Sequence, residues 1–104
     1  MSAYLIVDIA RITDEATYAR YRGEVSAGLA LAGGEYLARG GAVEVLEGDW
    51  RPHRIVLVRF ESAAAARAWW ASPAYAHLRD LRQSSTSTNM IVVDGMDRHA
   101  QEAS

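Results

Sequence analysis

The sequence predicts one α+β domain in which strands and helices follow in the order β-α-β-β-α-β. Two runs, residues 4–12 and 54–61, combine β-branched residues with bounding polar residues, which is typical of strands. Between them, apolar residues recur at steps of three and four, which is typical of an amphipathic helix. A second helical segment contains an internal proline. These observations favour a small sheet with helices packed on it.

The first strand, residues 4–12, reads YLIVDIARI. Its alternate side chains form two faces, with Leu5, Val7 and Ile9 on one and Tyr4, Ile6, Asp8 and Ala10 on the other. Both faces are largely apolar, which indicates a central strand covered on both sides.

The helix that follows has start and stop signals. Thr13 can cap it, and Asp14 and Glu15 place negative charge in its first turn, where the helix dipole favours it. We expect Gly33-Gly34 to end the helix, because glycine readily takes positive φ. The apolar stripe between these signals consists of Tyr18, Tyr21, Val25, Leu29 and Ala32.

The segment from Tyr36 to Trp50 reads YLARGGAVEVLEGDW. We expect a strand interrupted by Gly40-Gly41, a second short strand and a turn at Gly48. A glycine pair inside a strand suggests a bulge, a sharp bend or a close backbone approach. We interpret the segment as a kinked edge strand that bends around the mouth of a small cavity or reaches toward a partner subunit.

After the strand over residues 54–61, Ser62 is a suitable N-cap for a helix over AAAARAWWA. Pro73 should break this helix, because proline disfavours helical geometry at the preceding residue. The polar run QSSTSTN predicts a loop, and Met90 to Val93 a last short strand. One or two helical turns are expected after the proline, with Tyr75, Leu78 and Leu81 inward and Arg79, Asp80 and Arg82 wholly or partly outward.

This order of elements is the ferredoxin-like plan, whose first and third strands lie at the centre of a four-stranded antiparallel sheet. Two helices cover only one face of such a sheet. The opposite face would carry Tyr4, Ile6, Ile55 and Leu57, a patch that is unusual for a monomer. We therefore expect an isologous homodimer with the two sheets packed face to face.

The length and composition limit the number of domains and the classes of function. The 104 residues suffice for one core, and we assign residues 1–96 to the domain and 97–104 to a polar, disordered tail. The net charge of −2 argues against nucleic-acid binding, which needs a basic face. The absence of cysteine excludes disulfides and thiolate metal sites. Neither a signal peptide nor a bilayer-spanning apolar run is seen, so we expect a soluble, cytoplasmic protein without membrane contact.

The motifs RGG, LEGDW and SPAY, together with the opening YLIVDI, carry a resemblance to a known family. In this order and spacing, residues 3–96 resemble the bacterial family called domain of unknown function 1330, within the dimeric α/β-barrel superfamily. The resemblance implies a ferredoxin-like subunit that dimerises into a β-barrel. It implies no established activity. Superfamily relatives include cofactor-free monooxygenases, muconolactone-isomerase-like enzymes and haem-binding proteins.

Asp8 and Arg39 are the candidate catalytic residues. A carboxylate that faces a cavity among apolar neighbours can act as a general base, although Asp8 could instead pair with an arginine. Arg39 and Arg59 could hold an anionic substrate, because a guanidinium offers a planar fork matched to a carboxylate. For each arginine the alternative is a salt bridge at the surface or at an interface.

The other candidate substrate-binding residues are Trp50, Trp69, Tyr75 and His53. Aromatic side chains commonly line pockets, although Trp69 and Tyr75 fit the core as well. Adjacent Trp69 and Trp70 cannot both face the sheet, since neighbouring helix positions differ by about 100°. His53 could shuttle a proton, but no second ligand lies at metal-site spacing, so no metal or other cofactor is expected.

The sequence leaves two functions open, one without catalysis and one with it. The first is a homodimer that binds a small organic molecule, anionic or aromatic, in a cavity between sheet and helices. The alternative is a cofactor-free monooxygenase- or isomerase-like enzyme. An RNA-binding role is disfavoured, because the exposed sheet lacks a basic surface with paired aromatics.

Overall fold

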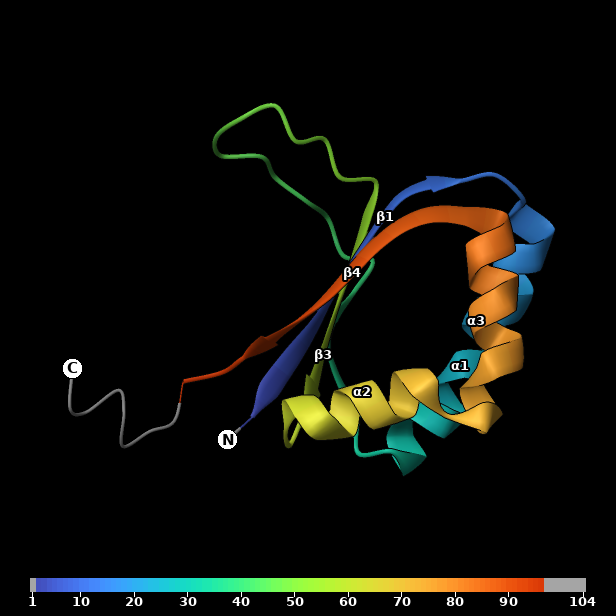
Figure 1. Ribbon diagram of the computed structural model, residues 1–104. Helices are drawn as coiled ribbons and strands as arrows, with labels where there is room; N and C mark the ends of the chain where they lie inside the picture. Colours follow the sequence, from blue (N-terminus) through green and yellow to red (C-terminus); the bar gives the residue numbers. More distant parts are fainter. Residues whose placement is uncertain (1, 97–104) are drawn as a thin grey trace.

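The computed structural model describes residues 2–96, so the tail predicted over residues 97–104 lies outside the described residues. The α+β order is confirmed, with the second helix split in two (Figure 1). In chain order the elements are β1 (Ala3–Ile12), α1 (Glu15–Leu31), β2 (Glu35–Arg39), β3 (Arg54–Phe60), α2 (Ala63–Ala71), α3 (Pro73–Ser85) and β4 (Thr86–Asp94).

Within residues 2–96, the four strands form one antiparallel sheet in the order β2-β3-β1-β4. The strands β1 and β3 therefore lie at the centre, as the ferredoxin-like plan requires. The helices cover one face of this sheet and leave the other open (Figure 1). This arrangement gives the sheet one face with a core and one face without.

The hydrophobic core lies between the sheet and the helices. One face of β1 contributes Leu5, Val7 and Ile9 to it. The other face of β1 is half-buried rather than covered, because no element within residues 2–96 packs on it. The predicted α1 stripe packs on the core face, and its buried members are Tyr18, Tyr21, Val25 and Leu29.

The N-cap of α1 is Asp14 rather than Thr13, so that prediction was wrong by one residue. The Asp14 carboxylate accepts hydrogen bonds from the backbone N–H of Thr17 at 3.1 Å and from its hydroxyl at 2.8 Å. These bonds, the one from the N–H above all, hold the pKa of Asp14 below its usual value. A carboxylate also interacts favourably with the helix dipole, which a neutral hydroxyl does not, so Asp14 is the better cap.

The capping and breaking signals of the second helical segment are confirmed. Ser62 caps α2 and accepts a hydrogen bond from the N–H of Ala65 at 3.0 Å. The helix ends before Pro73, and Ser72 then caps α3 by accepting a bond from the N–H of Tyr75 at 3.2 Å. Proline is favourable at the first helical position, because no N–H is needed there.

The loop predicted over QSSTSTN was wrong. Residues 83–85 form the last turn of α3, and β4 begins directly at Thr86. The Ser85 hydroxyl donates to the carbonyl of Leu81 at 2.6 Å, and the Thr86 hydroxyl donates to that of Arg82 at 2.7 Å. Hydroxyls thus satisfy the carbonyls that a helix end leaves free, so this polar run passes from helix to strand without a loop.

Residues 40–53, which we call the arm, project away from the sheet between β2 and β3 (Figure 1). The glycine pair interrupts the strand as predicted, since β2 ends at Arg39 and Gly40 has a φ of 70°. The second short strand expected beyond Gly41 was wrong, because within residues 2–96 no strand lies beside the arm to pair with it. The Gly40 N–H donates to the carbonyl of Ile55 at 2.9 Å, which fixes the bend.

Gly40→Ala should destabilise the protein, whereas Gly41→Ala should not. A Cβ at position 40 would be held at positive φ and would collide with the guanidinium of Arg54, whereas a Cβ at position 41 meets no atom within 4 Å. We expect Gly40→Ala to lower the free energy of unfolding by about 1–3 kcal/mol, measured by urea denaturation. The Gly41→Ala control should change it by less than about 0.5 kcal/mol. Equal losses in the two variants would contradict the proposed bend.

Candidate functional site

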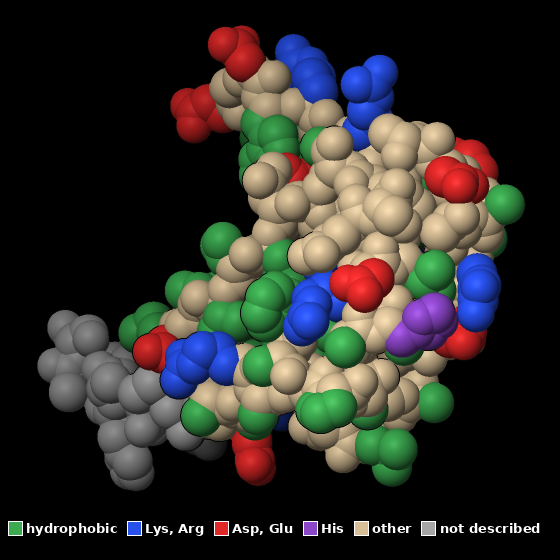
Figure 2. All heavy atoms as spheres, turned by 45° about the vertical axis from the view of Figure 1, so that its right-hand side comes forward, with side chains coloured by type: hydrophobic (Ala, Val, Ile, Leu, Met, Phe, Trp, Pro, Cys, Tyr) green, Lys and Arg blue, Asp and Glu red, His purple; other side chains and the backbone are tan. Residues whose placement is uncertain are grey.

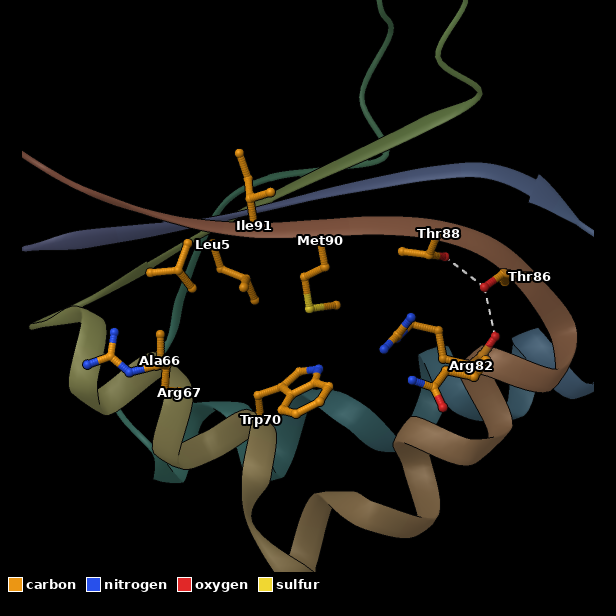
Figure 3. A pocket seen from close by; sticks show the side chains of 11 residues that line it. Leu5, Ala66, Arg67, Trp70, Arg82, Thr86, Thr88, Met90 and Ile91 are labelled. Carbon is orange, nitrogen blue, oxygen red and sulfur yellow. Dashed lines mark hydrogen bonds between the residues drawn. The ribbon is translucent and has the colours of Figure 1, made fainter.

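Two adjoining cavities lie between the sheet and the helices. The outer cavity, of about 470 Å³, is bounded by α2, α3 and β4 (Figure 3). The inner cavity, of about 40 Å³, lies deeper, between the sheet and α1. Leu5, Met90 and Arg82 line both cavities, so these side chains form the boundary between them.

The outer cavity has an apolar lining with a basic group directed into it. Trp70 faces Met90 across the cavity, and the guanidinium of Arg82 points into it from α3 (Figure 3). Ile91, by contrast, points away, toward the other face of the sheet (Figure 3). The surface around this region shows hydrophobic and basic side chains next to one another in a hollow (Figure 2).

Arg82 is buried, with 4 % of its surface exposed, so the prediction that it points outward was wrong. Its Nε donates a hydrogen bond to the hydroxyl of Tyr75 at 3.3 Å, which holds the side chain inside. The spacing of the two residues could have revealed this. Positions seven apart on a helix differ by about 20° after two turns, so Arg82 shares the inward face of Tyr75.

The hydroxyl of Tyr75 also bonds to that of Tyr21, at 2.9 Å, in the buried layer between α1 and α3. Burial, followed by the interaction with Tyr75, raises the pKa of Tyr21 far above its ordinary value. Tyr21 is therefore a neutral phenol at physiological pH and does not supply the negative charge that would compensate Arg82.

No aspartate or glutamate lines either cavity among residues 2–96. In the same part of the chain, the bond to Tyr75 is the one hydrogen bond of the Arg82 guanidinium, and its two terminal NH₂ groups have no protein acceptor. A buried charge is unfavourable unless it is paired and hydrogen-bonded. The outer cavity is thus suited chemically to an anion that reaches these NH₂ groups.

Arg39 lines the inner cavity, and a β-bulge directs it there. Tyr36 pairs with Val58, and Arg39 pairs with Val56. Tyr36 and Arg39 are three positions apart in β2, whereas their partners are only two positions apart in β3. The extra residue in β2 places Tyr36 and Arg39 on the same, helix-covered face, where regular alternation would separate them. The guanidinium of Arg39 lies over the Tyr36 ring, 4.6 Å from its centroid.

Trp69 and Tyr75 are core residues, 7 % and 2 % exposed, with ring centroids 4.1 Å apart. Trp69 lines the inner cavity and Trp70 the outer one. Trp70 is 41 % exposed, in accordance with the expectation that only one of the adjacent tryptophans can face the sheet. The carbonyl of Trp70 accepts a bond from Arg79 at 2.7 Å, and the Arg79 guanidinium stacks on its ring.

Four predicted site residues lie apart from both cavities. Asp8 is on the open face of the sheet, since it pairs with Ile55 across the ladder. The other three lie elsewhere: Arg59 forms an ion pair with Glu35 at 3.9 Å and donates to Ser2 at 2.8 Å, and Trp50 and His53 are exposed in the arm. The structure does not bring these residues together with Arg39.

Arg22 and Arg54 also line the inner cavity, and the sequence reasoning missed both. For Arg54 a signal was present, because Arg54, Val56 and Val58 alternate along β3 and therefore share a face. For Arg22 there was none, since it lies beside the apolar stripe of α1 rather than within it.

The sheet with helices on one face places the chain in the ferredoxin-like class of α+β folds. The chain belongs to the family described as domain of unknown function 1330, whose profile matches residues 2–96. No curated protein sequence is significantly similar to it. Within residues 2–96, no helix combines the length and apolar character needed to cross a membrane, and no group of three potential acidic, histidine or cysteine metal ligands occurs.

Solved structures share the fold. A protein of unknown function from Rhodopseudomonas palustris matches with a TM-score of 0.72 and 17 % identity, over 92 % of this chain and 83 % of that one. SnoaB, a cofactor-independent oxygenase from Streptomyces nogalater, matches with a TM-score of 0.63 and 10 % identity, over 92 % and 94 %. A protein from Nitrosomonas europaea, proposed to be an antibiotic biosynthesis monooxygenase, matches with a TM-score of 0.57 and 14 % identity, over 92 % of each chain. At these identities the likeness concerns the fold alone.

Proposed function

We propose that the protein is a homodimer in which each copy binds a small organic acid in the cavities between sheet and helices. The observation that carries this proposal is Arg82, a buried guanidinium whose terminal NH₂ groups face the outer cavity without a carboxylate partner among the described residues. A ligand carboxylate can accept two parallel hydrogen bonds from such a group.

The size and lining of the outer cavity support this class of ligand. Its volume of about 470 Å³ falls within the range of small-molecule sites. Leu5, Met90 and Trp70 offer an apolar surface for the organic part of the acid. An exposed arginine, Arg67, lies at the same cavity and adds to the attraction for an anion.

Arg82→Met should weaken the binding of carboxylic acids. We expect the wild-type chain to bind members of a panel that includes benzoate and octanoate, measured by isothermal titration calorimetry. Affinity should fall at least about tenfold in Arg82→Met, because a charge-assisted hydrogen bond is lost. Arg82→Lys should be intermediate, since it keeps the charge but lacks the planar fork.

The control is Arg20→Gln, which removes an exposed arginine of α1 that pairs with Glu24. It should bind the acids as the wild-type chain does. Circular dichroism establishes that each variant is folded. If no acid in the panel binds, or if folded Arg82→Met binds them as well as the wild-type chain, the proposal is wrong.

The open face of the sheet supports the homodimer. Ile91 and Val93 of β4 are 58 % and 45 % exposed there, beside half-buried apolar residues of β1 and β3. The arm extends this surface with a groove of about 550 Å³ against Ala38 and Ile55, to which Val43, Val45, Leu46 and Trp50 contribute. A continuous apolar surface of this kind is typical of an interface, and a second copy offers a self-complementary one.

Ile91→Asp should convert the dimer into a monomer, because it places a charge within the proposed interface. Leu31→Asp is the matched control, since Leu31 is 91 % exposed on α1, away from the open face. We expect multi-angle light scattering to give a dimer for the wild-type chain and for Leu31→Asp. A monomeric wild-type chain would refute the dimer.

The alternative, a cofactor-free monooxygenase- or isomerase-like enzyme, rests on Asp8. Its Oδ1 is inaccessible to solvent and has no hydrogen-bond partner within residues 2–96. In the proposed dimer Asp8 would lie between the two sheets, where an unpaired carboxylate could accept a proton from a substrate. Turnover of an acid by the wild-type chain, lost in Asp8→Asn, would favour this alternative over binding alone.

A further inference from the structure

The inner cavity has a second group of basic side chains, at the end formed by β2, β3 and α1: Arg22, Arg39 and Arg54. We propose that these three residues, the arginine cluster, bind a second anionic group, so that the natural ligand is a dicarboxylic acid with an apolar middle. This inference rests on the proposed function, because it assigns the other carboxylate to Arg82.

Arg54 is the most enclosed member of the cluster. It pairs with Ile9, whose side chain belongs to the core, so Arg54 lies on the helix-covered face of the sheet. Its Nε is buried and has no hydrogen-bond partner among the described residues. Its guanidinium packs closely against Gly40, and a Cβ there would require the guanidinium to move. The bend of the chain at Gly40 therefore leaves room for the Arg54 guanidinium, whose Nε has no hydrogen-bond acceptor among the described residues.

Arg22 and Arg39 line the same cavity as this guanidinium. The Cζ atoms of Arg22 and Arg54 are 5.8 and 6.0 Å from the centroid of the same ring, that of Tyr18. Arg39 donates from Nη2 to the backbone carbonyl of Arg22 at 2.8 Å, which joins β2 to α1. The aromatic faces of Tyr18 and Tyr36 stabilise the cations, but they do not neutralise them.

Arg54 is half-buried, whereas Arg22 and Arg39 are exposed, so water screens part of the repulsion between the three charges. An anion among them would offset the rest. No carboxylate lines the inner cavity within residues 2–96. The ion pairs found in the same part of the chain, Arg20 with Glu24 and Arg59 with Glu35, lie elsewhere. A β-bulge turns Arg39 to this face. Such bulges are frequent beside functional sites, where they change the direction of a side chain.

Arg82 and the arginine cluster form two basic ends of the joined cavities, at opposite edges of the sheet. Arg82 lies against β4 and Arg39 belongs to β2, and these are the two edge strands. Three interstrand spacings separate such strands, about 14 Å between their backbones. The lining between the basic ends is apolar and includes Val7, Val58 and Trp69. A molecule that spans them therefore needs an anionic group at each end and an apolar chain or ring between.

The inner cavity of about 40 Å³ has room for little more than water. A spanning ligand must therefore displace side chains at the boundary between the cavities. Met90 is suited to this movement, because an unbranched thioether side chain changes shape readily. The outer cavity would receive one carboxylate first, and the second would follow past Met90 to the arginine cluster.

The test compares suberate with octanoate, which has the same chain length and one carboxylate, by isothermal titration calorimetry. The wild-type chain should bind suberate at least about tenfold more tightly, because the second carboxylate gains charge-assisted hydrogen bonds. Arg39→Gln and Arg54→Gln should each reduce this ratio toward one and leave the affinity for octanoate nearly unchanged. The control Arg20→Gln, on the exposed side of α1, should keep the full ratio.

A wild-type ratio near one, with octanoate still bound through Arg82, would overturn the inference and leave the proposed function intact. If neither acid binds, the proposed function fails, and a titration with inorganic phosphate then decides whether the cluster binds anions. Saturable shifts of the Arg39 and Arg54 Nε–Hε NMR signals, absent at Arg20, would support the cluster as an anion site. Unmoved signals would overturn it.

Discussion

Within residues 2–96, the buried guanidinium of Arg82 is held by a tyrosine hydroxyl rather than by a carboxylate. Tyr75 binds its Nε, and Tyr21 binds Tyr75 in turn, which joins α1 to α3. Because burial keeps Tyr21 neutral, this network fixes the position of the charge without cancelling it. The terminal NH₂ groups remain directed into the outer cavity, which makes this side of the fold a suitable place for an organic anion.

The proposed function gives the two faces of the sheet separate roles. One face packs against the helices and contains the cavities with their arginines. The other is open and apolar, is extended by the arm, and carries Asp8. Ligand binding is assigned to the first face and association of two copies to the second. Because β1 and β3 form both faces, a ligand and a partner subunit can act on the same two strands without competing for the same residues.

Apart from three histidines, all basic residues of the chain are arginines, since the sequence contains no lysine. Arg54 is half-buried and Arg82 buried on the helix-covered face, and Arg39 is exposed at its edge. A planar guanidinium such as that of Arg39 or Arg54 can stack on tyrosine and still offer hydrogen-bond donors. A lysine could not combine the two interactions in the same way. The composition therefore matches the use that the structure makes of these side chains.

Much of the fold was predictable because the residues that a helix or strand buries recur at regular intervals in the sequence. The apolar runs of β1 and β3 and the stripe of α1 are confirmed for this reason, as are the signals at Ser62 and Pro73. The first half of β4 was missed, because an edge strand can be polar, and its serine and threonine hydroxyls bond to the end of α3.

The candidate site was less predictable than the fold. The spacing of Arg82 and Arg54 from neighbouring inward residues could have placed both on inward faces. The charge of Arg82 instead led to the expectation that it points outward. The turn of Arg39 toward the cavity depends on a bulge, and the separation of Asp8 from it depends on strand pairing. Both are properties of the register between strands, which the spacing of residues within one strand does not determine.

A crystal structure of the protein with octanoate tests the role of Arg82 most directly. The predicted result is a carboxylate within hydrogen-bonding distance of both terminal NH₂ groups of Arg82, with the alkyl chain against Leu5, Met90 and Trp70. An acid bound between the two sheets at Asp8, with Arg82 left in contact with solvent alone, would contradict it.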